Sequence, residues 1–455
     1  MRDEMCIRRS VSDFEIFQRD REGYADIFFD GSLPCDAVET GRVFARVTRE
    51  DSNLVVIPWT ECELSENRRD WSVTLRVPQG GLYCIEGYYA SEYTPGVTQL
   101  EWSAHIKNIE HVGVGDVFVT AGQSNMSGYG RDFAYDPPVL GVHMFANDGS
   151  WRIASNPATY IYGDIYPGAE GCSGTGPALS FARTVSREIG LPVGLVPCSI
   201  GATGLPSWNP LQVGVNFDMM VNKCRASGCN GFTGILWYQG CSDATPDTPD
   251  KYENYLASFT EMIREWRARY FGEDMPVITA QLNRQALDEP EHIGWSKVKE
   301  AQRRAAKTIP GVYVIPTLDM PSGDGIHNTS GANVIIGERM ASAFLRMHYG
   351  KPGMTAPNLD RVIRKSDTDF ILVFDGQREM RAFDSTKGLY FLSGDDRIDA
   401  RGAELTEEGV LVRTERAVPR GAVFCAYTGS EPEAFILRDA LGMPMLACYG
   451  VEVEE

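Results

Sequence analysis

Hydrophobic and polar residues alternate along roughly the first hundred positions of the chain, a pattern typical of half-buried strands. In the run WSVTLRVP, which begins at Trp71, the apolar residues Trp71, Val73, Leu75 and Val77 fall on one face and polar residues on the other. The runs GRVFARV, LVVIPW and GLYCIEGYY are similar, and turn residues separate them. Short alternating strands with such turns predict a β-sandwich.

From about Gly115 the chain changes to short runs that are apolar throughout, namely VFVTAG, PVGLVPCSI, GILWYQG, PVITAQL and VYVIP. Helical segments lie between them. One predicted helix follows Pro177, and its apolar stripe consists of Ala178, Ala182, Val185 and Ile189. The last predicted helix carries Ile336, Met340, Ala343, Phe344 and Met347. Fully apolar strands between amphipathic helices predict a parallel sheet with helices on both faces.

After residue 353 the β pattern returns in the runs FILVFDG, GLYFLSG, GVLVRT and GAVFCAY. These runs form a second β unit or complete the first one. A chain of 455 residues also exceeds one ordinary hydrophobic core. We therefore expect a β-rich accessory domain at residues 1–112, a three-layer α/β/α domain at 113–353 and a β-rich C-terminal domain at 354–455, with both flanking regions of the sandwich type.

Composition and charge narrow the classes of function. Apolar residues make up 43% of the chain, charged residues 23%, and the net charge is −19. So negative a chain repels phosphate backbones and anionic lipids, which argues against nucleic-acid and membrane partners. The N-terminal segment lacks the apolar core of a signal peptide, and the eleven cysteines are scattered. These features predict a cytoplasmic protein, or a secreted one if a leader has been removed.

Polar residues follow three of the apolar runs, where a parallel α/β sheet presents its ligand-binding edge. Ser124, Gly201 and Gln239 come at or near the ends of VFVTAG, PVGLVPCSI and GILWY. Asp324 and His327 stand three residues apart in DGIHNTSG, just before the last helix. A serine hydroxyl needs a base, and a carboxylate orients a histidine that acts as one. We therefore expect Ser124, His327 and Asp324 to converge in one catalytic site.

An ester-cleaving serine also needs donors for the oxyanion that develops on the carbonyl. The backbone N–H groups of Ser124 and Gly201 and the side-chain amide of Gln239 could supply them. Ser124 and Gln239 also have interpretations that involve no catalysis. Ser124 could be a turn residue or helix cap, and Gln239 could satisfy buried backbone groups. The glycine-rich stretch GCSGTGPALSFA, residues 171–182, lacks the Lys-Ser/Thr of a phosphate loop, so a nucleotide site is not expected there.

The blocks AGQSNM, SIGATGLPSW, WYQGCSD and DGIH together resemble the four sequence blocks of the SGNH hydrolases, in particular the sialate O-acetylesterase and carbohydrate acetylesterase branch. The resemblance implies an SGNH-type α/β/α fold, with Ser124 as nucleophile, His327 as base and Asp324 as its partner. It also implies an oxyanion hole that includes Gly201 and Gln239, and no metal or organic cofactor. Cys241 departs from the family pattern, which usually has Glu after Gln-Gly; any role of that Glu in shaping the pocket is either missing here or taken by Asp243.

The expected activity is removal of O-acetyl groups from a small acetylated sugar or oligosaccharide, as in sialate O-acetylesterases. Acetylated xylan, mannan or another plant glycan is an alternative substrate. A carbohydrate-binding protein without activity and a lipase or thioesterase are alternatives from other classes. Candidate substrate contacts are the polar and aromatic residues beside the blocks: Gln123, Asn125, Trp208, Tyr238 and Asp243.

Overall fold

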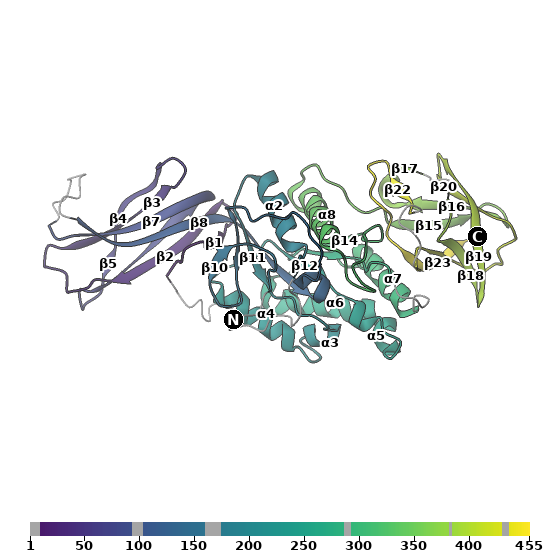
Figure 1. Ribbon diagram of the computed structural model, residues 1–455, viewed down its shortest axis with the longest axis horizontal. Coiled ribbons are helices and arrows are strands. Elements are labelled where there is room, and N and C mark those ends of the chain that lie inside the picture. Colours follow the sequence, from purple (N-terminus) through teal and green to yellow (C-terminus); the bar gives the residue numbers. More distant parts are fainter. Residues whose placement is uncertain (1–9, 93–102, 160–173, 286–292, 382–384, 430–435) are drawn as a thin grey trace.

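The computed structural model describes residues 10–92, 103–159, 174–285, 293–381, 385–429 and 436–455. Three parts follow one another along its longest axis, with an N-terminal β unit, a central α/β unit and a C-terminal β unit (Figure 1). Each part has its own cluster of buried apolar residues. The two β units lie at opposite ends of the molecule (Figure 1). The C-terminal β unit therefore has a separate core and does not complete the N-terminal one.

The N-terminal unit packs two sheets face to face, as its alternating pattern predicts. One sheet has the order β2-β6-β5, and the other joins β4 to β3, β3 to β7 and β7 to β8. Trp71, Leu75 and Val77 of β6 are buried in the core between the sheets, while Thr74 and Arg76 are exposed. The strands are β1 (Ile16–Gln18), β2 (Tyr24–Ser32), β3 (Arg42–Arg49), β4 (Val55–Glu61), β5 (Glu63–Leu64), β6 (Asp70–Pro78), β7 (Gly80–Ala90) and β8 (Ser103–Gly122).

Strand β8 is shared between the N-terminal and central units. Its first part pairs antiparallel with β7, and its last part pairs parallel with β11 and β12. The expected boundary between residues 112 and 113 lies inside this strand. The junction is reinforced by Asp116 of β8, which is 2% exposed and accepts hydrogen bonds from Arg19 (2.9 Å from Nε and from Nη2) and from the hydroxyl of Tyr349 (2.6 Å). A charged group so deeply buried needs such partners.

The central sheet has the order β10-β9-β11-β8-β12-β13-β14, parallel except for the edge strand β10. Helices α2 and α8 cover one face, and α3, α4 and α6 lie on the opposite side (Figure 1). Its remaining strands are β9 (Val142–Phe145), β10 (Trp151–Ile153), β11 (Val193–Pro197), β12 (Gly234–Tyr238), β13 (Val277–Ala280) and β14 (Val312–Ile315). The predicted three-layer α/β/α arrangement is therefore confirmed.

The helices of this unit are α1 (Ser124–Ser127), α2 (Ala178–Ile189), α3 (Leu205–Trp208), α4 (Val215–Ala226), α5 (Pro249–Glu253), α6 (Tyr255–Trp266), α7 (Ile293–Thr308) and α8 (Ser330–Tyr349), with shorter turns η1 (Cys241–Asp243) and η2 (Arg267–Phe271). The stripe predicted for α2 is buried except for Ile189, which packs partly buried against the core. None of the helices in the described ranges has both the length and the apolar character needed to span a membrane.

The C-terminal strands close into a barrel with the order β15-β16-β20-β19-β18-β21-β23. Closure leaves no open sheet edge. The barrel is docked on the central unit by Gln281, whose side chain exchanges two hydrogen bonds with the backbone of Ala447 (3.0 and 2.9 Å). Its elements are β15 (Leu359–Arg364), β16 (Asp369–Phe374), η3 (Asp375–Gln377), β17 (Met380–Arg381), β18 (Leu389–Ser393), β19 (Asp396–Thr406), β20 (Gly409–Thr414), β21 (Val423–Ala426), β22 (Arg438–Asp439) and β23 (Cys448–Glu454).

Candidate active site

The candidate residues gather where three neighbouring strands end. The backbone N–H of Ile200, after β11, donates to the carbonyl of Gly122 at the end of β8 (2.9 Å), and the N–H of Gln123 donates to the carbonyl of Tyr238 at the end of β12 (3.0 Å). Gly122 has φ +128°, and a Cβ there would collide with the Tyr238 carbonyl. Only glycine allows the chain to turn so tightly from β8 into α1. The glycine before Gln-Ser-Asn thus brings Ser124 to the sheet edge.

Ser124, His327 and Asp324 form a continuous chain of hydrogen bonds. Ser124 Oγ lies 2.8 Å from His327 Nε2, and His327 Nδ1 lies 2.8 Å from Asp324 Oδ2. Ser124 is 6% exposed, so the hydroxyl is largely shielded yet reachable. With the proton on Nδ1 directed at the carboxylate, Nε2 is left to accept the hydroxyl proton of Ser124. This arrangement can turn the serine into a nucleophile.

Asp324 is held in place by the loop that carries the histidine. Its Oδ1 accepts the backbone N–H groups of Ile326 and His327, both at 2.8 Å. Partial burial raises the pKa of Asp324, but these N–H groups and the imidazole lower it by a larger amount. The pKa of Asp324 therefore lies below the usual value for Asp. The carboxyl is therefore ionised at neutral pH and stabilises an imidazolium when one forms.

Asn125 fixes the spacing between nucleophile and base. Its Nδ2 donates to the carbonyl of Ile326 and its Oδ1 accepts the N–H of Asn328, both at 3.0 Å. One carboxamide thus grips the backbone on either side of His327. Asn328 in turn donates to the hydroxyl of Tyr238 (3.1 Å) and accepts from the amide of Asn283 (2.8 Å). The histidine loop is therefore tied to α1 and to the ends of β12 and β13.

Two backbone N–H groups are available as oxyanion donors. Ser124 opens α1, so its N–H has no partner within the helix. Among the described residues, the N–H of Gly201 likewise has no acceptor, and it directly follows Ile200, which is bonded to β8. Both donors are thus adjacent to the nucleophile.

The structure does not support the expected role of Gln239 as a donor in this site. Gln239 is fully buried, and its two amide hydrogens go to the carbonyl of Thr203 (3.0 Å) and to the Asp243 carboxylate. Its Oε1 accepts the hydroxyl of Tyr255 (2.9 Å). A carboxamide has only two N–H donors, and both are used here. Gln239 instead satisfies buried groups, which is the ordinary interpretation raised by the sequence.

Gln123, unlike Gln239, is bonded to described residues through its carboxamide oxygen and not through its amide nitrogen. Its Oε1 accepts the N–H groups of Gly240 (3.0 Å) and Ser242 (3.4 Å), and its own amide nitrogen donates to no described residue. Because backbone N–H groups fix which end of the carboxamide is the oxygen, the NH2 end must point elsewhere. An amide donor is therefore free beside Ser124, in the residue directly before it.

The remaining candidates for substrate contact are buried. Asn125, Tyr238 and Asp243 are 1% exposed and Trp208 is fully buried, while Gln123 is 2% exposed. Trp208 packs in a cluster with Trp237 and Trp266 and donates from Nε1 to Thr203 Oγ1 (3.0 Å). In this structure Asn125, Tyr238, Trp208 and Asp243 hold the sequence blocks together rather than facing a substrate, which corrects the expectation.

Asp243 and Cys241 both lie in the Gln-Gly block and are both buried. Asp243 accepts the backbone N–H of Leu205 (3.1 Å to Oδ2) at the start of α3 and an amide hydrogen of Gln239, and burial raises its pKa above the usual value. It thereby links this block to the glycine-rich block that carries Gly201. Burial raises the pKa of Cys241 to about 12, so this thiol is not a nucleophile at neutral pH.

The sequence reasoning missed Tyr129. Its ring stacks on the imidazole of His327 with centroids 3.8 Å apart, and the guanidinium of Arg131 lies 4.1 Å from the centroid of the same tyrosine ring. The aromatic contact restrains the imidazole in the plane that reaches Ser124. Tyr129 follows the nucleophile by five positions in a glycine-rich turn. No periodic pattern applies to such a turn, so only its position after the serine block could have pointed to it.

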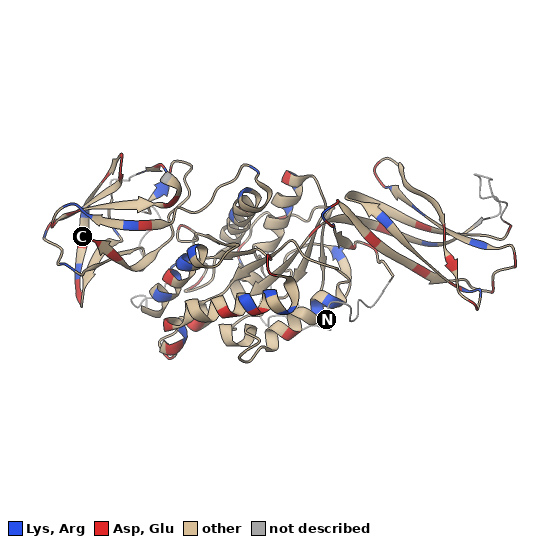
Figure 2. Cartoon of the chain, turned by 180° about the vertical axis from the view of Figure 1, so that it is seen from behind, with Lys and Arg blue, Asp and Glu red and all other residues tan. Residues whose placement is uncertain are grey.

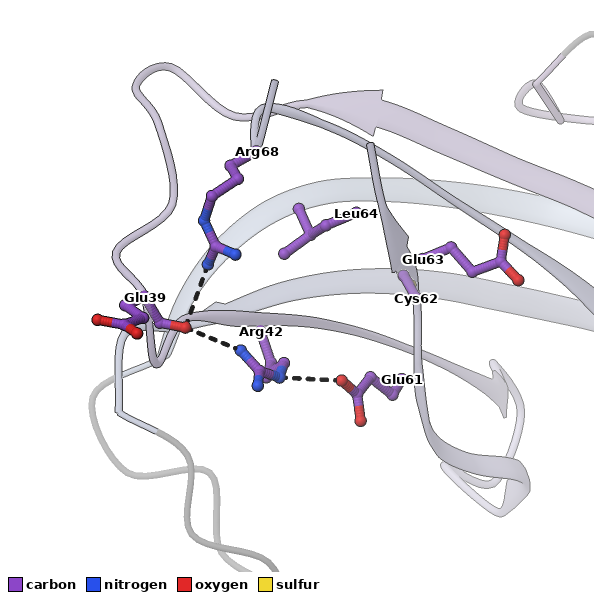
Figure 3. A pocket seen from close by; sticks show the side chains of 7 residues that line it. All are labelled: Glu39, Arg42, Glu61, Cys62, Glu63, Leu64 and Arg68. Carbon is purple, nitrogen blue, oxygen red and sulfur yellow. Dashed lines mark hydrogen bonds and ion pairs between the residues drawn. The ribbon is translucent and has the colours of Figure 1, made fainter. Parts of the chain in front are cut away.

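Other parts of the described chain offer less chemistry. A depression on the N-terminal sheets is lined by Glu39, Arg42, Glu61, Cys62, Glu63, Leu64 and Arg68 (Figure 3). Arg42 Nε lies 3.1 Å from Glu61 Oε1, and Arg68 donates to the backbone carbonyl of Glu39. Within the described ranges, no three His, Cys, Asp or Glu side chains are grouped to hold a metal ion. Basic and acidic positions are interspersed along helices and strands (Figure 2).

Known proteins resemble this chain in sequence family and in fold. Residues 114–346 match the family model described as carbohydrate esterase, sialic acid-specific acetylesterase. The chain is similar in fold to the crystal structure of a carbohydrate acetylesterase from Xanthomonas citri, with a TM-score of 0.64, 20% identity and coverage of 96% of this chain and 97% of that one.

Weaker likenesses cover less of the fold. A protein from Arabidopsis thaliana is 25% identical over 51% of this chain and 98% of its own, with a TM-score of 0.44. A family two carbohydrate esterase from Clostridium thermocellum, in complex with cellohexaose, is 12% identical over 72% of this chain and 90% of its own, with a TM-score of 0.33. None of the curated proteins matches the chain.

The family match confirms the resemblance to the sialate O-acetylesterase branch of the SGNH hydrolases, and it spans both the serine block and the histidine loop. The matched segment makes up more than half of the chain. The protein therefore belongs to the sialic acid-specific acetylesterase family of carbohydrate esterases and is a carboxylic ester hydrolase.

Proposed function

We propose that the protein removes O-acetyl groups from an acetylated carbohydrate through an acetyl-enzyme intermediate on Ser124. The observation that carries the proposal is the unbroken hydrogen-bond chain from Ser124 Oγ through His327 to Asp324, with both links at 2.8 Å. It lies at the carboxyl ends of a parallel sheet, where α/β enzymes bind their substrates. Family membership supports a carbohydrate ester as the substrate class.

The reaction begins when Ser124 Oγ attacks the acetyl carbonyl carbon while His327 Nε2 takes the hydroxyl proton. The N–H groups of Ser124 and Gly201 and the amide of Gln123 donate to the carbonyl oxygen as it becomes negative. The imidazolium then gives its proton to the sugar oxygen, and the bond between that oxygen and the acetyl carbon breaks. His327 next deprotonates a water molecule, which attacks the acetyl group, releases acetate and restores the serine.

A carboxylate-bearing sugar is the substrate that the family match favours. An acetylated sialic acid carries such a carboxylate, and the family model that the chain matches is described as sialic acid-specific.

Acetate release across a substrate panel tests the proposal. The panel consists of acetylated sialic acid, acetylated xylo- and manno-oligosaccharides, nitrophenyl acetate and nitrophenyl octanoate. We expect release from at least one sugar ester, fastest from the sialate, and faster cleavage of the acetyl than of the octanoyl ester. Hydrolysis of the octanoate at the rate of the acetate, with no release from any sugar, would contradict the proposal and favour a lipase or thioesterase.

The rate should depend on pH because only the neutral imidazole can accept the serine proton, so kcat/KM should fall in acid. Asp324 remains a carboxylate at neutral pH, because the N–H groups and the imidazole around it outweigh burial and keep its pKa below the usual Asp value. A pH–rate profile that is flat from acid to alkaline pH would contradict His327 as the base.

A further inference from the structure

The segment between α1 and β9 exposes two aromatic side chains. Phe133 is 92% exposed and Tyr135 is 80% exposed, more than any other large hydrophobic side chain in the described part of the chain. The described residues offer neither ring an aromatic or cationic partner. Large apolar surface left in water costs free energy, and such patches commonly mark binding sites.

Two aspartates attach this segment firmly to the body of the protein. Asp132 accepts the backbone N–H of Ser330 on its Oδ1 and the Ser330 hydroxyl on its carbonyl, both at 2.6 Å. Asp136, whose side chain is 3% exposed, is paired with Arg183 of α2 and accepts from the amide of Asn156 (2.7 Å). Phe133 and Tyr135 lie between these two attachment points. The rings are therefore presented by a restrained loop, which reduces the entropy lost when a ligand binds.

The segment also starts at the catalytic imidazole. Tyr129 stacks on His327, and Ser330, to which Asp132 is bonded, is the third residue after His327. Phe133 lies four positions after Tyr129, and four positions span at most roughly 14 Å even when fully extended. The exposed rings thus lie within reach of a short glycan whose acetyl group is at Ser124.

We propose that Phe133 and Tyr135 form an aromatic platform that stacks against a sugar ring of an oligosaccharide substrate, outside the ring that carries the acetyl group. Flat aromatic faces suit the apolar face of a pyranose. The chemistry at Ser124 needs only the acetyl group and its own sugar, so the platform selects longer glycans without taking part in bond breaking. The inference rests on the proposed function and specifies its substrate class.

Steady-state kinetics of Phe133→Ala, Tyr135→Ala and the double variant test the platform. The substrates are an acetylated tetrasaccharide, the matching acetylated monosaccharide and nitrophenyl acetate. Each single variant should raise KM for the tetrasaccharide about five- to tenfold, as expected for loss of one stacked ring, while kcat and both small-substrate values stay unchanged. Phe133→Trp should retain a low KM, because it keeps a flat ring. Tyr24→Ala, at an exposed aromatic position of the N-terminal unit, is the control and should change none of these values.

The outcomes separate this inference from the proposed function. If the wild-type protein cleaves nitrophenyl acetate but no sugar acetate, the proposed function fails. If sugar acetates are cleaved and the platform variants affect the tetrasaccharide and the monosaccharide alike, or neither of them, the platform is wrong while the proposed function stands. Because both rings are exposed, the variants should fold as the wild type does, which a thermal melt within about 2 °C of wild type would verify.

Discussion

Replacing Ser124 by alanine is expected to lower kcat/KM for nitrophenyl acetate and for a sugar acetate at least about 10⁴-fold. In the proposed mechanism the hydroxyl forms the acetyl-enzyme, and its partner His327 Nε2 lies 2.8 Å away. What remains after its loss is the modest rate that substrate binding and the oxyanion donors give to attack by water. The measurement is acetate release over time, corrected for spontaneous hydrolysis.

Ser127→Ala provides a matched control within the same short helix. Ser127 is 1% exposed, and its hydroxyl donates only to the carbonyl of Gln123 (3.3 Å). Its loss should cost stability but leave the rate within a fewfold of wild type. His327→Ala should be about as damaging as Ser124→Ala, and the double variant no worse than either, since the two residues act as a unit. A Ser124→Ala variant with more than a tenth of wild-type activity would rule out this serine as the nucleophile.

Replacing Gln123 by glutamate is expected to lower kcat for the sugar acetate by about 10²- to 10³-fold with a much smaller change in KM. The new carboxylate keeps an oxygen for the N–H groups of Gly240 and Ser242, which bond Oε1 now. It replaces the free NH2 end by a second oxygen, which repels the developing oxyanion instead of donating to it. The selective effect on kcat follows because the donor is needed mainly when the charge has formed.

Gln239→Met is the corresponding control for the other glutamine of the two blocks. Its amide is fully used by Thr203 and Asp243, so its loss should lower the melting temperature through unsatisfied buried groups. The folded fraction should retain most of its kcat. Equal losses of kcat in the two variants, or a larger loss in Gln239→Met, would return the donor role to Gln239. Both variants are compared at equal folded concentration, determined by titrating the active serine with a covalent inhibitor.

The sequence anticipated those features that depend on local pattern. The apolar faces of β6 and α2 follow from periods of two and 3.6 residues, and the strand ends that carry Ser124, Gly201 and Gln239 meet because parallel strands share one edge. The stripe of the last helix was predicted well for Ile336, Met340 and Phe344, which are fully buried, but Met347 is 49% exposed. That residue lies in the last turn of α8, which period alone cannot distinguish from the turns packed on the sheet.

Tertiary contacts account for what the sequence could not give. Whether Trp208 faces a sugar or a core depends on Trp237 and Trp266, which lie far from it along the chain. Which of Gln123 and Gln239 can act as a donor depends on which amide nitrogen already has acceptors. Thr203 and Asp243 accept from the amide of Gln239, whereas the N–H of Gly240 bonds the oxygen of Gln123. Neither periodicity nor motif spacing carries that information.

Strand β8 gives the N-terminal unit a mechanical part in presenting the nucleophile. One strand leads from the antiparallel ladder with β7 to Gly122, two residues before Ser124, and Asp116 anchors it between the two ladders. The sandwich and the serine are therefore joined by one continuous strand. Replacing the sandwich by an unrelated carrier would therefore have to preserve the pairing register of β8, because a slip of one residue there would turn every following side chain to the opposite face of the sheet.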